Sequence, residues 1–194
     1  MVGLPGCGKT YIARKIARYL RWNSYRTRVF SLAKYRYVAL CKHFKLILLF
    51  NRIRLDKVGT KTAEFFDPSS TTYYQMRVKL MEEAIDDCLR YLSRGGMVAI
   101  IDGTNTTVER RQLLRKHLAK DGAVDTLWIE SIYAEGVHLS TRQWDELRHS
   151  PDFLDKKDYS KRLDFYRQNY VNVGEDEGSF LKVSRRHYYS LQYY

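Results

Sequence analysis

The chain has 194 residues, 44% of them hydrophobic and 14% aromatic, which predicts one folded domain with a real core and excludes a disordered chain. Its longest aliphatic cluster, Leu46–Phe50, is far shorter than the roughly 18 residues of a membrane span. Three widely spaced cysteines without a CxxC pair argue against a disulfide scaffold or a zinc site. With no signal peptide at its start, the chain is expected to be cytoplasmic, with no membrane contact.

The positive charge is concentrated in the first quarter of the chain. Residues 1–55 contain 13 Lys and Arg and no acid, whereas the remainder has 21 bases (34 − 13) against 22 acids. The whole excess of +12 therefore lies near the start. Such asymmetry favours an anionic partner, although a solvated basic face is the plainer interpretation.

Helix-like and strand-like segments alternate, which predicts an α/β fold with a mainly parallel sheet. Helices are expected at Thr10–Leu20, Thr72–Leu92, Val108–Lys120, Val137–Arg148 and Asp158–Tyr170. Strands are expected at Arg28–Leu32, Met97–Ile101, Leu127–Ile132 and Phe180–Val183. The longest helical pattern is marked by a stripe of five residues spaced four apart: Met76, Leu80, Ala84, Cys88 and Leu92.

Gly3–Thr10 (GLPGCGKT) match the phosphate-loop pattern G-x4-G-K-T. Its glycines let backbone N–H groups form a nest around phosphate, and the following helix adds its positive end. Lys9 is expected to reach the β- and γ-phosphates of ATP, and the Thr10 hydroxyl to ligate Mg²⁺. The alternative is a glycine-rich turn without a ligand. Because only Met1 and Val2 precede the loop, we expect its supporting strand to be truncated.

A second half-site follows the apolar strand Met97–Ile101, which ends in Asp102. A carboxylate at this position of a parallel sheet can hold Mg²⁺ or accept a proton from an attacking hydroxyl. The alternative is that Asp102 caps the next helix. On that helix, one of the adjacent Arg110 and Arg111 could face the crevice and clamp a second phosphate.

Seven segments in chain order resemble the kinase domain of the 6-phosphofructo-2-kinase/fructose-2,6-bisphosphatase family: GLPGCGKTY, YLRW, VFSLAKYR, EFFDP, DGTNTTVERR, WIESI and SPDF. The resemblance implies a P-loop NTPase-like three-layer α/β sandwich over residues 1–183, followed by a C-terminal remnant at 184–194. The phosphatase motif Arg-His-Gly-Glu does not occur in the sequence, so we expect a kinase domain without bisphosphatase activity.

The resemblance further implies ATP- and Mg²⁺-dependent phosphorylation of fructose 6-phosphate at its 2-hydroxyl, which gives the glycolytic regulator fructose 2,6-bisphosphate. Lys9 and Asp102 would be catalytic, and Thr10 and Asp102 would hold the metal. The residues implied in ATP binding are Gly3, Leu4, Pro5, Gly6, Cys7, Gly8, Lys9, Thr10 and Tyr11. Those implied in fructose 6-phosphate binding are Arg36, Arg77, Thr104, Arg110, Arg162 and Tyr166. A homodimer is also implied, and nucleic acid is not an expected partner.

The chain departs from the family at several places. Residues 41–58 interrupt a segment that the family connects more directly; we interpret them as an insertion, and an amphipathic helix is the alternative. Their deletion, together with the restoration of an apolar strand before Met1, is expected to raise soluble yield and kinase activity, because Leu46–Phe50 would expose an apolar patch. Leu147 stands where the family has Lys, and Gly6-Cys7 where it has Ala-Arg. Within the amide nest, Cys7 is either a stabilised, oxidation-sensitive thiolate or an inert side chain.

Two other functions remain open. One is a kinase that acts on a different small molecule or on a polynucleotide. The other is a catalytically impaired module of this family that only binds nucleotides or polyanions. The short first strand, Leu147 and the net charge of +12 would favour the impaired module.

Overall fold

The computed structural model describes residues 1–36, 62–119, 124–132, 155–185 and 189–193. The expected insertion at 41–58 and the expected helix at Val137–Arg148 lie outside these ranges. Within them, every expected helix and strand is present, with ends that differ from the expected ones by at most two residues. No helix in the described ranges is long and apolar enough to cross a membrane.

Four of the five strands in the described ranges form two parallel pairs. β1 (Thr27–Ser31) pairs with β2 (Val98–Asp102), and β3 (Trp128–Ile132) pairs with β4 (Phe180–Arg185). An unexpected strand, β5 (Tyr189–Tyr193), adds to β4 in the antiparallel direction. The expectation of a mainly parallel sheet is therefore confirmed.

The first residues of the chain lie between these two pairs of strands. The Val2 N–H donates to the carbonyl of Ile129 (2.8 Å), and the Val2 carbonyl accepts from the Ser131 N–H (2.8 Å), both on β3. On the other side, the amino group of Met1 donates to the carbonyl of Ile101 on β2 (3.0 Å). Val2 forms a single parallel bridge rather than a strand, yet it occupies the centre of the sheet.

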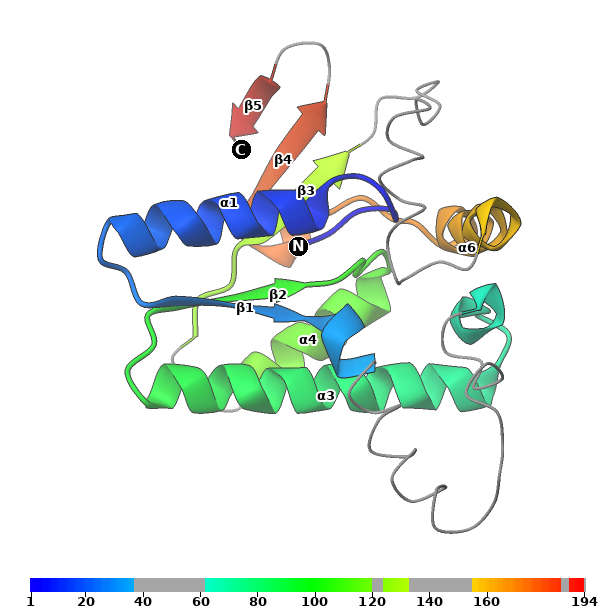
Figure 1. Ribbon diagram of the computed structural model, residues 1–194, viewed down its shortest axis with the longest axis horizontal. Coiled ribbons are helices and arrows are strands. Elements are labelled where there is room, and N and C mark those ends of the chain that lie inside the picture. The colour runs from blue at the N-terminus through cyan, green and yellow to red at the C-terminus, as the bar shows by residue number, and fades with distance from the viewer. Residues whose placement is uncertain (37–61, 120–123, 133–154, 186–188, 194) are drawn as a thin grey trace, which may run out of the picture.

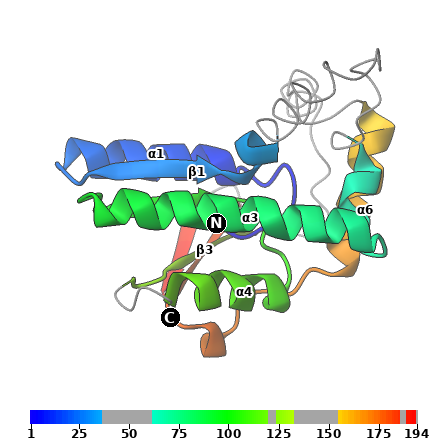
Figure 2. The same cartoon turned by 90° about the horizontal axis from the view of Figure 1, so that it is seen from below.

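Helices cover both faces of this sheet, as Figures 1 and 2 show: α1 (Lys9–Trp22) lies on one face, and α3 (Thr71–Ser93) and α4 (Val108–Leu118) lie on the other. The core beneath α1 is built by Met1, Ala13, Ala17 and Ile100. The core beneath α3 and α4 is built by Val2, Met81, Ile85, Leu114, Leu118, Trp128 and Val173. The expected three-layer sandwich is thus confirmed.

The buried face of α3 coincides only in part with the stripe of residues spaced four apart. Met81 and Ile85 are buried together with Ala84 and Cys88, whereas Met76 is 39% exposed. The reason is geometric, because a step of four residues turns the helix by about 400° and each step drifts by about 40° from the core. A strict spacing of four therefore leaves the core-facing side over the length of this helix.

Two further helices lie near the carboxyl ends of β1 and β2 (Figure 1). α6 (Lys156–Gln168) begins at Asp155, whose side chain accepts from the Asp158 N–H (2.8 Å). It packs against the short helix η2 (Ala63–Phe66). A second short helix, η4 (Glu175–Glu177), follows α6, and neither short helix was expected from the sequence.

Candidate functional site

The phosphate loop connects the centre of the sheet to α1. At Gly3 the backbone has φ 138°, and a Cβ would lie 2.5 Å from the carbonyl oxygen of Ser131, so only glycine fits there. Gly8, at φ 80°, is the N-cap of α1. The Lys9 side chain folds back over the loop, and its Nζ donates to the carbonyl of Leu4 (2.5 Å). The loop is thus preformed around a buried ammonium group.

Lys9 and Thr10 both lie close to Asp102. Burial lowers the pKa of Lys9 to about 8, against the opposing influence of Cys7 and Asp102. The Thr10 hydroxyl donates to Oδ2 of Asp102 (2.8 Å), and Asp102 is itself buried at the end of β2. The phosphate loop and the strand carboxylate therefore form one site.

Asp102 does not cap the helix that follows it. α4 is capped by Thr107, whose hydroxyl accepts from the Arg110 N–H (3.3 Å). The interpretation of Asp102 as a helix cap was therefore wrong, because five residues separate it from the first turn of α4.

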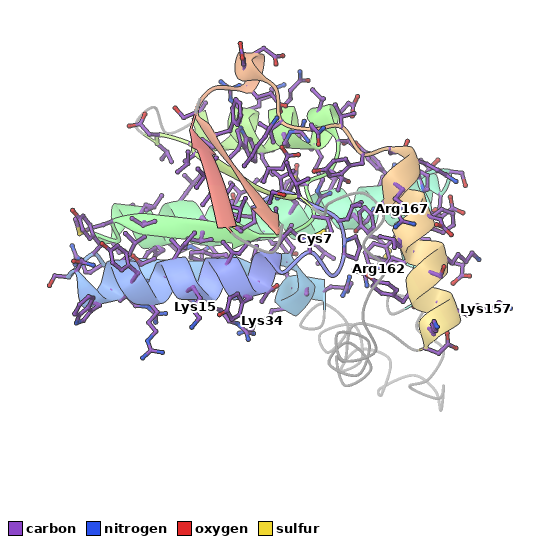
Figure 3. All side chains as sticks on the ribbon, turned by 90° about the horizontal axis from the view of Figure 1, so that it is seen from above. Cys7, Lys15, Lys34, Lys157, Arg162 and Arg167 are labelled. Atoms are coloured by element: carbon purple, nitrogen blue, oxygen red, sulfur yellow. The ribbon has the colours of Figure 1, made fainter. Side chains whose placement is uncertain are left out.

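A cavity of about 1040 Å³ opens beside the loop. Its lining includes the loop from Pro5 to Tyr11, Asp102 and all six residues that the resemblance implied in sugar-phosphate binding: Arg36, Arg77, Thr104, Arg110, Arg162 and Tyr166. Gly3 and Leu4, the first two residues of the loop, are not among the lining residues, and the Leu4 carbonyl accepts the hydrogen bond from Lys9. Figure 3 shows the loop, marked by Cys7, between α1 and α6, and Arg162 on the side of α6 that faces the loop.

The arginines of this cavity come from separate parts of the chain, and two of them have neutral partners. Arg77, on α3, donates to the backbone carbonyls of Phe65 and Asp67. Arg110, on α4, donates from Nε to Oδ1 of Asn105 (3.2 Å). Burial lowers the pKa of Arg77 and of Arg110, although a guanidinium remains charged at neutral pH. Partly buried charge with neutral partners is suited to an anionic ligand.

Comparison with known proteins identifies the family. The family model described as 6-phosphofructo-2-kinase matches residues 1–189. The chain belongs to the 6-phosphofructo-2-kinase family. It is 32% identical to a 6-phosphofructo-2-kinase/fructose-2,6-bisphosphatase of Caenorhabditis elegans over 94% of its own length and 40% of the relative's. It is 35% identical to 6-phosphofructo-2-kinase/fructose-2,6-bisphosphatase 1 of Rattus norvegicus over 93% of its own length and 36% of the relative's.

The chain thus spans well under half the length of these curated relatives. The recognised resemblance and the P-loop kinase-like fold are confirmed by the family match. Of the departures from the family pattern, Leu147 lies outside the described residues, and Cys7 lies within them. Burial raises the pKa of the Cys7 thiol, which favours the inert interpretation over a stabilised thiolate.

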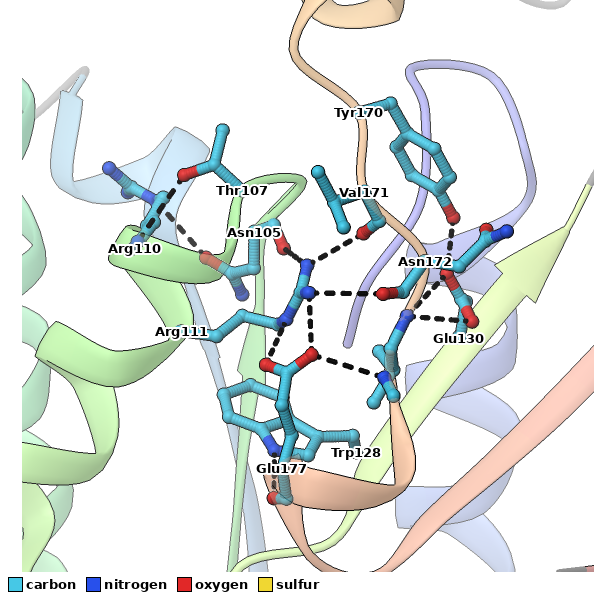
Figure 4. A network of polar contacts seen from close by, with 12 residues as sticks. Asn105, Thr107, Arg110, Arg111, Trp128, Glu130, Tyr170, Val171, Asn172 and Glu177 are labelled. Carbon is cyan, nitrogen blue, oxygen red and sulfur yellow. Dashed lines mark hydrogen bonds and ion pairs between the residues drawn. The ribbon is translucent and has the colours of Figure 1, made fainter.

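The adjacent arginines of α4 point to different places. Arg110 lines the cavity, whereas Arg111 is completely buried behind it (Figure 4). Arg111 donates two hydrogen bonds to the carboxylate of Glu177, from Nε to Oε2 (2.6 Å) and from Nη2 to Oε1 (2.7 Å). It also donates to the carbonyls of Asn105 (3.2 Å), Val171 (2.9 Å) and Asn172 (3.3 Å). This side chain therefore joins the loop after β2 to the segment that follows α6.

Three supporting contacts of the site were not predicted. The Ser131 hydroxyl donates to the carbonyl of Cys7 (2.5 Å), and the Tyr159 hydroxyl donates to the carbonyl of Pro5 (3.1 Å). Asn105, at φ 44°, donates from Nδ2 to the carbonyl of Met1 (2.9 Å). Ser131 and Asn105 lie in segments that carry the family resemblance, which was their only signal, and Tyr159 had none.

The residues present fit a magnesium ion. Mg²⁺ prefers hard oxygen ligands and keeps several waters or phosphate oxygens in its shell. The Thr10 hydroxyl and the Asp102 carboxylate are such ligands, and they already lie within hydrogen-bonding distance of each other at the start of α1. These two side chains would hold the ion.

Proposed function

We propose that this chain transfers the γ-phosphoryl group of ATP to the 2-hydroxyl of fructose 6-phosphate. The observation that carries the proposal is the shared cavity, because the phosphate loop and Asp102 line it together with four arginines. These four side chains, called the arginine cluster below, are Arg36, Arg77, Arg110 and Arg162. Its volume of about 1040 Å³ is at the upper end of pockets that hold one small ligand, so it has room for a nucleotide and a sugar phosphate. Membership of the family supports the same reaction.

Lys9, Thr10 and Asp102 have distinct roles in this proposal. Backbone N–H groups of the loop and the Lys9 ammonium bind the phosphates of ATP and stabilise the charge that develops on transfer. Asp102 accepts the proton of the sugar 2-hydroxyl as its oxygen attacks the γ-phosphorus, and the bond between that phosphorus and the oxygen shared with the β-phosphate breaks to release ADP. Magnesium held by Thr10 and Asp102 would neutralise charge on the phosphates.

The arginine cluster positions the acceptor. Arg36, Arg77, Arg110 and Arg162 reach the cavity from four parts of the chain and would hold the 6-phosphate dianion of the sugar. Rigid binding at one end of the sugar orients the 2-hydroxyl for in-line attack, which converts binding energy into rate. This arrangement favours a phosphorylated sugar over the neutral sugar.

The test is ADP release measured with a panel of acceptors: fructose 6-phosphate, fructose, glucose 6-phosphate and an oligonucleotide with a free 5′-hydroxyl. We expect turnover that depends on fructose 6-phosphate and that is absent in Lys9→Met. Faster turnover with another acceptor would support the alternative kinase. ATP binding without turnover on any acceptor would support the impaired module.

The resemblance to the family also leads us to propose a homodimer that works in the cytoplasm. Size-exclusion chromatography with light scattering tests the first point, and a mass of one chain at micromolar concentration would contradict it.

A further inference from the structure

The short helix η2 contacts three of the arginines that line the cavity. Phe65 and Phe66 at its end are both buried, at 1% and 8% exposure, and both border the cavity. Their rings meet edge to face, with centroids 5.1 Å apart and an interplanar angle of 86°. Two aromatic rings in fixed orientation are thus placed next to side chains that carry positive charge.

Phe66 contacts two of these arginines through the face of its ring. The guanidinium carbon of Arg162 lies 3.7 Å from the ring centroid, and that of Arg36 lies 5.0 Å from it. Both arginines are buried, at 6% exposure. Two like charges drawn into one buried place repel each other, and the negative face of an aromatic ring offsets that repulsion.

The same short helix also contacts two other side chains that line the cavity, those of Arg77 and Tyr166. The carbonyl of Phe65 accepts a hydrogen bond from Arg77, whose guanidinium carbon lies 5.9 Å from the Phe65 ring centroid. The ring of Tyr166 on α6 lies 5.7 Å from that of Phe66. One turn of four residues therefore touches side chains from α3, from α6 and from the segment after β1.

We propose that Phe66 is a positioning residue for the anion site: the face of its ring holds the guanidinium groups of Arg36 and Arg162 together so that they converge on one phosphate. This inference rests on the proposed function for the identity of that anion. Without the ring face, the two charges separate in the ligand-free protein and must be brought together again on binding. The affinity for the anion falls accordingly, and the affinity for ATP does not.

The first experiment compares Phe66→Leu with Phe66→Tyr by calorimetric titration of fructose 6-phosphate and of ATP. Leu keeps apolar volume but loses the ring face, and we expect it to weaken sugar-phosphate binding about 5- to 30-fold. Tyr keeps the ring face and is expected to bind within about threefold of the original protein. ATP affinity is expected to stay unchanged in both variants.

Phe30→Leu is the matched control. Phe30 is also a buried phenylalanine, at 2% exposure, with the Arg28 guanidinium carbon 5.1 Å from its ring centroid, but it does not line the cavity. We expect it to lower the unfolding midpoint without changing either affinity. If Phe66→Leu and Phe30→Leu weaken sugar-phosphate binding equally, Phe66 contributes only packing and the proposal is overturned.

A fluorination series keeps the test decisive if Phe66→Leu does not fold. Phenylalanine with one, two or three ring fluorines at position 66 preserves shape while it weakens the negative ring face step by step. We expect sugar-phosphate affinity to fall with each fluorine. A flat series would overturn the proposal.

The two proposals can fail separately. If the original protein binds inorganic phosphate but not fructose 6-phosphate, the proposed substrate is wrong, and the same variants titrated with phosphate still test Phe66. If it binds fructose 6-phosphate and the variants make no difference, only the role of Phe66 is wrong. If it binds neither anion, both proposals are wrong.

Discussion

Glu177→Gln is expected to destabilise the protein strongly. The Glu177 carboxylate accepts two bonds from Arg111, whose side chain is completely buried and is otherwise bonded to neutral carbonyl oxygens (Figure 4). Gln has nearly the same size but no charge, so it leaves a buried guanidinium without its counter-charge. Breaking a buried ion pair at one partner costs about 3–5 kcal/mol. That is a large share of the roughly 5–15 kcal/mol by which a domain is stable.

The exposed ion pair between Lys161 and Glu64 provides the control. Its Nζ–Oε1 distance of 2.7 Å resembles that of the buried pair, but its side chains are 53% and 54% exposed. Glu64→Gln is therefore expected to cost no more than about 1 kcal/mol. The assay is urea unfolding followed by circular dichroism, with the slope compared between variants. If Glu177→Gln lowers the free energy of unfolding no more than Glu64→Gln does, the buried ion pair between Arg111 and Glu177 does not stabilise the fold through its charge, and the reasoning is refuted.

The pH dependence of the free energy of unfolding tests the ion pair between Arg111 and Glu177 independently. Burial raises the pKa of Glu177, but the hydrogen bonds from Arg111 and from the Gly174 N–H outweigh it, and the net pKa is lowered from 4.5. A lowered pKa in the folded state means that this contribution is complete above about pH 4.5 and is lost as pH falls through the folded-state value. Glu177→Gln should remove that part of the acid sensitivity. If the variant loses stability with falling pH as steeply as the original protein does, this assignment is wrong.

Three further predictions concern the site. The pKa of Lys9 is about 8 without ligand, and bound phosphates favour its ammonium form, so ATP binding at pH 8 should be accompanied by proton uptake. Calorimetry in two buffers of different ionisation enthalpy measures this uptake. Lys9→Met should abolish both the proton uptake and phosphoryl transfer. Asp102→Asn should lower kcat by about 10²-fold or more with ATP affinity preserved, and near-normal turnover would disprove its role as the proton acceptor. Arg77→Ala should raise the sugar-phosphate KM about 10- to 150-fold in steady-state kinetics; an equal rise in the ATP KM would mean that Arg77 acts on the fold instead.

The features of the site that depend on local sequence were predictable. The phosphate loop needs glycines at fixed places, followed at once by Lys9, and an apolar strand that ends in Asp102 needs only a few neighbouring residues. Both patterns lie within short windows. The order of helices and strands followed from periodicity in the same way.

Features that depend on distant partners were not predictable. Adjacent residues of a helix point about 100° apart, so the sequence pattern alone left open which of Arg110 and Arg111 faces the cavity. The choice is made by Glu177, which lies 66 residues after Arg111. Phe66 carries no periodic signal, because a four-residue helix is too short to show one.

The most direct measurement of the central claim is the position of the transferred phosphoryl group. Fructose 6-phosphate labelled with ¹³C at C2 is incubated with the protein, ATP and Mg²⁺, and the product is followed by ¹³C and ³¹P NMR. The account predicts that, in step with ADP release, the C2 signal gains a two-bond coupling to phosphorus and the new ³¹P signal shows no coupling to the C1 protons. A phosphoryl group on C1, or ADP formed without any new coupling at C2, would contradict it.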